Sequence, residues 1–181
     1  MTTPLGPQTV LVTGACGNVG VVTVQALAKR GYRVVALDLD SPRNRQRARA
    51  LPAGVTVRWG SICDRATLAS AVLGVDHVIH LAAVIPPATD VDQRMAYKVN
   101  VQATRTLIAL CEASAKRPRL TFTSSAAVFG DNARATPPRR ASDPVQASDN
   151  YTRQKLDSER DLQASSLRWV VFRLAVTPPG E

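Results

Sequence analysis

Short nonpolar runs alternate with longer stretches of helical periodicity along nearly the whole chain, and this alternation constrains the fold more than any other feature. The runs do not alternate polar with nonpolar residues, so they predict strands that are buried on both faces of a sheet. Such strands, when helices separate them, are typical of a parallel sheet that is covered on both sides. The predicted strands are Thr9–Thr13, Arg33–Asp38, Val55–Trp59, His77–Leu81, Leu120–Ser124 and Arg168–Leu174.

The stretches between these strands complete a regular succession of strands and helices. Helices are predicted over Val19–Arg30, Pro42–Ala50, Ala66–Leu73, Asp92–Ala115 and Tyr151–Gln163, and a loop is predicted over 130–150. The chain has 181 residues, which is the length of one domain. We therefore predict an α/β fold, a Rossmann-type doubly wound parallel sheet with strand order 3-2-1-4-5-6 and helices on both faces.

The composition excludes several other classes of protein. Hydrophobic residues make up 45% and charged residues 20% of the chain, as in an ordinary globular protein. The three cysteines, Cys16, Cys63 and Cys111, lack CxxC spacing and a His partner, so neither a disulfide scaffold nor a metal site is expected. No nonpolar run approaches the ~18–20 residues that span a bilayer. The first residues do not resemble a signal peptide, and we expect a cytoplasmic protein without a membrane partner.

The net charge of +9 raises the question of a nucleic-acid partner, because basic proteins bind polyanions. Arginine accounts for 19 of the 23 basic residues, but these arginines are spread from Arg30 to Arg173. Only 4% of the residues are aromatic, so aromatic side chains do not interleave with the basic ones. We therefore expect a small-molecule substrate and no nucleic-acid partner.

Three glycines follow the first predicted strand at a spacing of three residues. Gly14 permits a tight turn, Gly17 lets the backbone approach a diphosphate, and Gly20 lets the next helix pack close to the strand. The free N–H groups and the positive end of that helix favour a phosphate group. The position between a strand and a helix makes a nucleotide-binding turn the preferred interpretation, although the spacing is GxxGxxG rather than GxGxxG.

Asp38 ends the second predicted strand, where an acidic side chain can accept hydrogen bonds from the ribose hydroxyls of an adenosine group. The same carboxylate repels a 2′-phosphate, so the sequence favours NAD over NADP. An arginine cluster follows directly, and Arg43 or Arg45 could instead reach a 2′-phosphate. NAD is the expected cofactor, with NADP left open.

Tyr151 and Lys155 lie four residues apart on a predicted helix, so that their side chains share one face. A phenol with a pKa near its usual ~10 is a poor base at neutral pH. We expect Lys155, together with a bound nicotinamidium ring, to lower the pKa of Tyr151. Tyr151 could then exchange a proton with the substrate while hydride moves to or from the cofactor.

Serines close the fifth predicted strand in the run Thr123–Gly130. Open α/β sheets place their sites at the carboxyl ends of strands, and these serines lie at such an end. A hydroxyl there could hydrogen-bond the reacting oxygen and hold it against Tyr151.

Together these segments resemble the extended short-chain dehydrogenase/reductase family, in its NAD-dependent epimerase/dehydratase branch. The matching segments cover almost the whole chain: the turn at 14–20, Asp38, residues 62–64, residues 80–83, Asn100, residues 124–130 and the YxxxK pair at 151–155. The resemblance implies that Ser125 is the catalytic serine and that Tyr151 is the general acid/base. It also implies that Lys155 binds the nicotinamide ribose and that Asn100 steadies the catalytic site.

The resemblance extends the set of expected cofactor-binding residues. Besides the three glycines, Asp38, Arg43, Tyr151 and Lys155, this set contains Asn18, Val19, Ser61, Ile62, Leu81, Ala82 and Ala83. Ser61 departs from the family, because many members carry an Asp there that binds the adenine amine. Val176 also departs, because many nucleotide-sugar enzymes carry an Asn there.

Three functions follow from this reading. The preferred one is an NAD(P)-dependent oxidoreductase that acts on a hydroxyl or carbonyl group of a small polar or sugar-like substrate. The second is an NAD-dependent epimerase of a sugar or nucleotide sugar, and the third is a dinucleotide-binding module without catalysis.

Family members usually continue for a hundred or more residues. We therefore expect residues 1–174 to form the NAD-binding domain and 175–181 to begin a substrate-binding region. The resemblance further implies a homodimer that pairs through the helices at 92–115 and 151–163.

Overall fold

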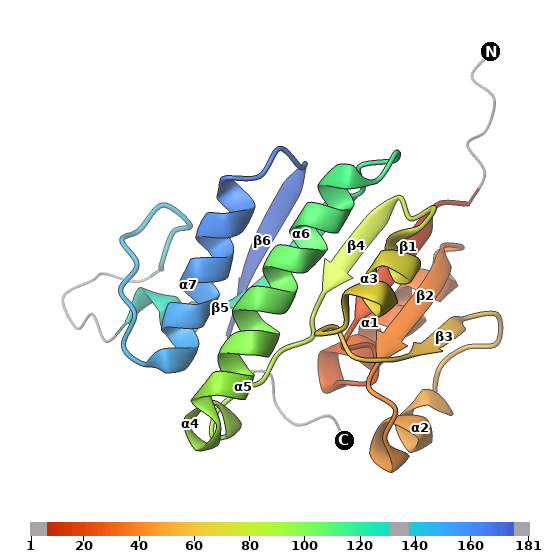
Figure 1. The fold of residues 1–181 in the computed structure, drawn as a ribbon, viewed down its shortest axis with the longest axis horizontal. Coiled ribbons are helices and arrows are strands. Elements are labelled where there is room, and N and C mark those ends of the chain that lie inside the picture. Colours follow the sequence, from red (N-terminus) through yellow and green to blue (C-terminus); the bar gives the residue numbers. More distant parts are fainter. Residues whose placement is uncertain (1–6, 131–137, 176–181) are drawn as a thin grey trace.

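A six-stranded parallel sheet forms the centre of the structure, in the order β3-β2-β1-β4-β5-β6 (Figure 1). This computed structural model describes residues 7–130 and 138–175. The strands are β1 (Thr9–Thr13), β2 (Arg33–Asp38), β3 (Thr56–Trp59), β4 (His77–His80), β5 (Arg119–Ser125) and β6 (Trp169–Leu174). The fold class and the strand order predicted from the sequence are confirmed.

Helices cover the sheet on both faces (Figure 1). They are α1 (Asn18–Lys29), α2 (Pro42–Ala48), α3 (Arg65–Val72), α4 (Ala88–Val91), α5 (Gln93–Tyr97), α6 (Ala103–Ala113) and α7 (Asn150–Gln163). A turn of π-helix (Lys98–Gln102) joins α5 to α6, and a turn of 3₁₀-helix (Ala126–Phe129) follows β5. Apart from the stretch at 92–115, the boundaries of the predicted helices and strands differ from these by no more than two residues, and the short helix α4 was not predicted.

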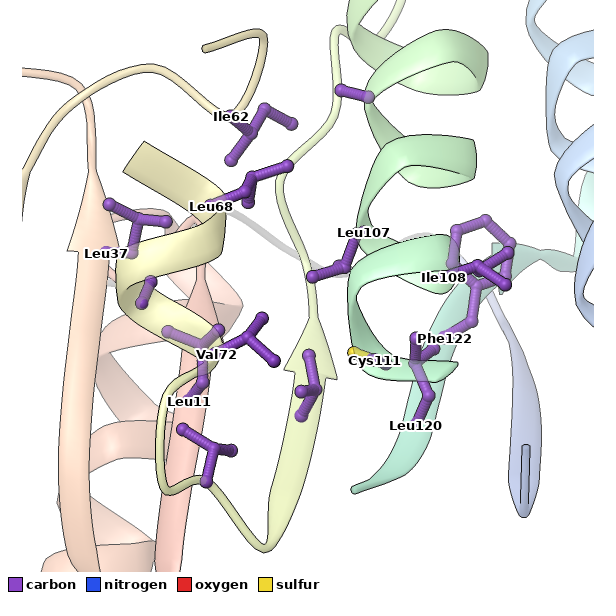
Figure 2. Packing of buried hydrophobic residues seen from close by; sticks show 14 of the residues in the cluster. Leu11, Leu37, Ile62, Leu68, Val72, Leu107, Ile108, Cys111, Leu120 and Phe122 are labelled. Atoms are coloured by element: carbon purple, nitrogen blue, oxygen red, sulfur yellow. The ribbon is translucent and has the colours of Figure 1, made fainter. Parts of the chain in front are cut away.

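Each face of the sheet has its own hydrophobic core, because side chains alternate between the faces along a strand. Leu11 and Phe122 belong to the cluster that packs under α3 and α6, and this cluster also contains Leu68 and Leu107 (Figure 2). The neighbouring residues of β1 belong to a second cluster, which includes Val24 of α1. The nonpolar runs of the sequence are therefore explained by burial on both sides.

The stretch predicted as one helix over Asp92–Ala115 is interrupted in the structure. It divides into α5, the π-helical turn at Lys98–Gln102, and α6. A π-helical turn accommodates an extra residue within a helix and is often found at functional sites. Here it contains the buried Asn100, and sequence periodicity does not reveal such a local change in helical pitch.

The strand order reverses direction at β1, which pairs with β2 on one side and with β4 on the other. The chain therefore leaves β1 and β4 toward opposite sides, and this opens a crevice at the carboxyl ends of the strands. The segments that end at Thr13, Asp38, His80 and Ser125 all reach this edge of the sheet. Among the residues that the structure describes, no helix combines the length and the nonpolar character that crossing a lipid bilayer requires.

Candidate active site

At two glycines of the turn between β1 and α1, the surrounding backbone leaves no space for a side chain. Gly14 has a φ of +68°, and a Cβ there would lie 2.7 Å from the backbone nitrogen of Ala82. A Cβ on Gly20 would lie 2.2 Å from the carbonyl oxygen of Gly14. The first turn of α1 is thus packed directly against the end of β1, and any larger residue would push the two apart.

Gly17 precedes α1 as its N-cap residue and offers no side chain to the first N–H groups of the helix. Its own N–H donates to the carbonyl oxygen of Gly14 over 3.0 Å, which closes the turn. The first turn of α1 also contains no acidic residue. These features leave the positive end of the helix open to an anionic ligand.

Asp38 lies beside this turn at the end of β2. Its Oδ2 accepts the N–H of Cys16 over 2.7 Å, and its Oδ1 accepts the N–H of Leu39 over 2.7 Å and the amide of Asn44 over 3.0 Å. Burial and the Asp38 carboxylate raise the pKa of the Cys16 thiol to about 11. Cys16 is therefore a packed residue of the turn rather than a reactive thiol.

A cavity of about 410 Å³ lies between the glycine turn, the end of β2 and the segment after β4. Of the predicted cofactor-binding residues, it is lined by Gly14, Gly17, Asn18, Asp38, Arg43, Ser61, Ile62, Leu81, Ala82 and Ala83. Arg45 does not line it, because its guanidinium group pairs with Asp40 over 2.6 Å and lies over the ring of Trp59. Arg47, which the sequence analysis did not select, does line it.

A second cavity, of about 530 Å³, continues from the glycine turn toward β5 and α7. The two cavities share the residues Gly14, Gly17, Asn18, Leu81, Ala83 and Ile85, so that together they form one cleft. Ser125, Tyr151 and Lys155 line the second cavity, as do Val19 and Gly20. The structure therefore brings the predicted catalytic side chains to one end of the cleft and Asp38 to the other.

The start of α7 fixes the position of Tyr151 and Lys155. The Asp149 carboxylate accepts the N–H of Thr152 over 2.7 Å, and the Thr152 hydroxyl accepts the N–H of Asp149 over 3.1 Å. This capping box begins the helix at Asn150. Tyr151 is therefore in the first turn, and Lys155 lies one turn later on the same face.

Lys155 is buried, with 4% of its surface exposed. Its Nζ donates to the carbonyl oxygen of Thr123 over 2.8 Å and lies 4.9 Å from the ring centre of Phe122. Burial lowers the pKa of the ammonium group to about 8, and the carboxylate of Glu159 acts in the opposite direction. The group is thus charged at neutral pH, and its remaining N–H groups are available for further partners.

The pKa of Tyr151 shifts upward in the chain alone, whereas the sequence analysis expected Lys155 and a bound nicotinamidium ring to lower it. Burial raises the pKa of its phenol above the usual value, the carboxylate of Asp149 adds to the rise, and a hydrogen bond with Ser125 opposes it. The Lys155 Nζ lies 5.7 Å from the ring centre of Tyr151 and donates to Thr123 instead of to the phenol. The lowering that we expected from Lys155 is therefore not present in the chain alone.

Asn100 is 3% exposed and lines neither cavity of the cleft. Its Oδ1 accepts the N–H of Val84 over 2.8 Å, and its Nδ2 donates to the carbonyl oxygen of Val84 over 2.9 Å. The same Nδ2 donates to Oε1 of Gln154 over 2.7 Å. Asn100 thus ties the segment after β4 to α7, and Gln154, which lies next to Lys155, completes this link.

His80 extends the buried polar network below the cleft. One ring nitrogen lies 2.6 Å from the Thr13 hydroxyl and the other 3.0 Å from the Thr104 hydroxyl, which donates to the carbonyl oxygen of Asn100. Burial lowers the pKa of His80 to about 3, so its ring is neutral at physiological pH. The ring thus links the end of β1 to α6 from its place at the end of β4.

In the hydroxyl run at the end of β5, the sequence analysis assigned an individual role to Ser125 alone, and it did not select Gln154. Ser124 and Thr123 also line the second cavity, and the Ser124 hydroxyl is buried without a hydrogen-bond partner among the described residues. The run of hydroxyl residues at the end of β5 was the available signal for both. Gln154 had no comparable signal, because only the packing of α7 against the π-helical turn shows its contact with Asn100.

Comparisons with known proteins agree with this geometry. The family model described as "NAD dependent epimerase/dehydratase family" matches residues 10–177. A D-erythronate dehydrogenase from Cupriavidus necator is 33% identical over 133 residues, which are 67% of this chain and 40% of that protein. Sterol demethylase protein B from Methylococcus capsulatus is 32% identical over 169 residues, which are 89% of this chain and 48% of that protein.

This chain is also similar in fold to solved structures. UDP-glucose 4-epimerase from Brucella ovis, in complex with NAD, is 28% identical and superposes with a TM-score of 0.79. That comparison covers 92% of this chain and 51% of the epimerase. The chain thus spans about half the length of the relatives it matches.

Proposed function

Because the chain belongs to the NAD-dependent epimerase/dehydratase family, we propose that it binds NAD and catalyses hydride transfer between this cofactor and a substrate. The substrate is a small polar or sugar-like molecule that carries a hydroxyl or carbonyl group. The observation that carries this proposal is the shared cleft. One cavity joins the glycine turn to Ser125, Tyr151 and Lys155, while the adjoining cavity reaches Asp38.

The residues of the cleft fit a dinucleotide. The glycine turn packs closely against its neighbouring backbone, and the uncapped start of α1 offers N–H groups to a diphosphate. Asp38, at the end of β2, has a carboxylate that can accept the ribose hydroxyls. When bound, NAD accepts or gives hydride at its nicotinamide ring. Arg43 lies in the same cavity as Asp38 and leaves NADP as an alternative cofactor.

The chain's own residues supply the proton and the positioning. Tyr151, protonated at neutral pH, donates its phenolic proton to the carbonyl oxygen during reduction and takes it back during oxidation. The Ser125 hydroxyl holds the same oxygen against the phenol. The Lys155 ammonium group is held by Thr123 beside Phe122 and can bind the nicotinamide ribose with its free N–H groups. Asn100 positions these groups without touching the substrate.

The test is an absorbance assay at 340 nm with NAD and then NADP against sugars, uronic acids, hydroxysteroids and simple alcohols. With the wild-type protein we expect the cofactor to be reduced as the substrate hydroxyl is oxidised to a carbonyl group. Tyr151→Phe should abolish turnover and leave NADH binding nearly intact, because the variant loses the acid/base hydroxyl but keeps the aromatic ring and all the other expected cofactor-binding residues. Unchanged turnover in Tyr151→Phe would exclude Tyr151 as the acid/base.

A sugar epimerase is the second candidate, because a solved UDP-glucose 4-epimerase matches most of this chain. An epimerase oxidises and then reduces the same substrate, so the assay would show no net change at 340 nm. An inverted sugar product, detected by NMR, would identify this activity. Tight binding of NADH without any product would instead indicate a dinucleotide-binding module that lacks catalysis.

We propose that residues 1–174 form the dinucleotide-binding unit and that 175–181 begin the substrate-binding region. A homodimer through α5, α6 and α7 is supported by the exposed nonpolar side chains of Met95 and Tyr97 on α5. Light scattering of the purified protein measures this directly, and a monomer mass would exclude the dimer.

The three free cysteines support a cytoplasmic location, because they fit a reducing compartment.

A further inference from the structure

Arg47 differs from the other arginines around α2. Arg43, Arg45 and Arg49 are exposed, whereas Arg47 is half-buried. Its Nη2 donates to Oδ1 of Asn18 over 2.7 Å, although the two residues are 29 positions apart in the sequence. This contact brings the guanidinium group of α2 to the first residue of α1, directly after the glycine turn.

The surroundings of this guanidinium group contain little negative charge. Within the described part of the chain, the ion pairs do not include Arg47, and its partner Asn18 is neutral. Asp38 is the one acidic residue that lines this cavity, and its carboxylate already accepts two backbone N–H groups and the amide of Asn44. Arg43 adds a second positive charge to the lining.

The charge of Arg47 acts on the glycine turn itself. Among the influences on the Cys16 thiol, which lies within the turn, Arg47 is the one that lowers the pKa. The open start of α1 adds its own positive potential at the same place. The Arg47 guanidinium group, which has no ion-pair partner among the described residues, and the start of α1 therefore create a positive electrostatic potential in the same cavity. Binding of an anion there would be favourable.

We propose that Arg47 binds the diphosphate bridge of the dinucleotide, as a charged ligand beside the backbone N–H groups of the glycine turn. This inference rests on the proposed function, because it concerns the same cofactor. A guanidinium group carries five N–H donors, and the bond to Asn18 uses one of them. The others can donate to phosphate oxygens in the paired geometry that arginine favours. Asn18 is then the positioning residue that directs the guanidinium group toward the turn.

The test compares Arg47→Gln with Arg49→Gln by titration calorimetry. Arg49 follows α2, is exposed and lines neither cavity, so its replacement makes the same change of charge away from the cleft. The ligands are NADH, NADPH, ADP and adenosine. For Arg47→Gln we expect NADH and ADP to bind about 10- to 100-fold more weakly, as for a lost charged hydrogen bond, while adenosine is unaffected. Arg49→Gln should bind all four ligands as the wild type does.

Each other outcome contradicts the inference in a recognisable way. A loss confined to NADPH would assign Arg47 to the 2′-phosphate instead of the diphosphate. An equal loss for adenosine, or a lower unfolding temperature than Arg49→Gln, would indicate a distorted cavity. Arg47→Gln with wild-type affinities would show that the guanidinium group does not bind phosphate. A wild-type protein that binds neither NADH nor ADP would overturn the proposed function together with this inference.

Discussion

Tyr151 and Lys155 lie on one face of the same helix, but burial shifts the pKa of each side chain in its own direction. Burial raises the pKa of the phenol and lowers that of the ammonium group to about 8, since each charged form loses hydration. Below that pH the chain therefore holds a neutral phenol close to a charged ammonium group. This protonation state suits reduction of a carbonyl group, in which Tyr151 must give a proton.

The pH dependence of the two reaction directions should differ accordingly. Oxidation of an alcohol requires the phenolate, so its rate should rise with pH, by up to tenfold per unit, between about pH 6 and pH 8. Carbonyl reduction should change little between about pH 6 and pH 7, because the phenol keeps its proton and Lys155 keeps its charge, and it should begin to fall near pH 8, where Lys155 loses its charge. Steady-state rates in both directions measure this, and Tyr151→Phe is the control. An oxidation rate that is already constant at the acidic end would contradict the raised pKa of Tyr151.

At the scale of elements, α7 is held in place by two residues that face away from the cleft. Gln154 accepts the amide of Asn100, and the Ser158 hydroxyl donates to the carbonyl oxygen of Asn100 over 2.8 Å. The π-helical turn presents both groups of Asn100 to α7. The position of Tyr151 and Lys155 over the cleft thus depends on a contact between two helices rather than on either helix alone.

Replacing Gln154 should test this dependence. Gln154→Leu leaves one N–H of the buried Asn100 amide without a partner, which should lower the free energy of unfolding by about 1–3 kcal/mol. We also expect kcat to fall more than the affinity for NADH, since the acid/base residue Tyr151 would be displaced on α7. Gln154→Glu keeps the accepting oxygen and serves as the matched variant, with smaller losses. Urea unfolding and steady-state kinetics provide both readings. Equal kcat in wild type and Gln154→Leu would show that the link has no catalytic role.

At the scale of the whole molecule, the edge strand β6 is tied to the sheet by β5 and to α7 by one buried ion pair. Arg173 donates to both carboxylate oxygens of Glu159, over 3.2 and 2.8 Å, and Glu159 is only 3% exposed. The Arg173 guanidinium group also donates to the carbonyl oxygen of Ala141 and lies over the ring of Phe129. This pair therefore joins β6, α7 and the loop before α7.

Replacing only one residue of the Arg173–Glu159 pair should lower the free energy of unfolding more than replacing both. Arg173→Met leaves the buried Glu159 carboxylate without its paired guanidinium group, which should lower the free energy of unfolding by about 3–5 kcal/mol at neutral pH. The double variant Arg173→Met/Glu159→Leu should recover much of the loss. Chemical denaturation at neutral pH measures all three proteins, and a double variant no more stable than Arg173→Met would contradict the prediction.

Much of the fold and of the site could be predicted because their signals are local. The nonpolar runs define the strands, and the positions of Gly14, Asp38 and Tyr151 follow from where strands end and helices begin. What could not be predicted depends on contacts between distant segments. The approach of Arg47 to Asn18 and the bond between Asn100 and Gln154 join elements that the sequence leaves unrelated.

By itself, the sequence determined the class of fold, the order of the strands and the identity of the residues at their carboxyl ends. Burial on both faces and the needs of a tight turn restrict the residue types at single positions, and so they can be read directly. The tertiary structure alone decided which arginine of α2 faces the glycine turn, how Asn100 is used and in which direction the pKa of Tyr151 shifts. These depend on burial and on the direction of side chains, and both are set by packing rather than by spacing along the chain.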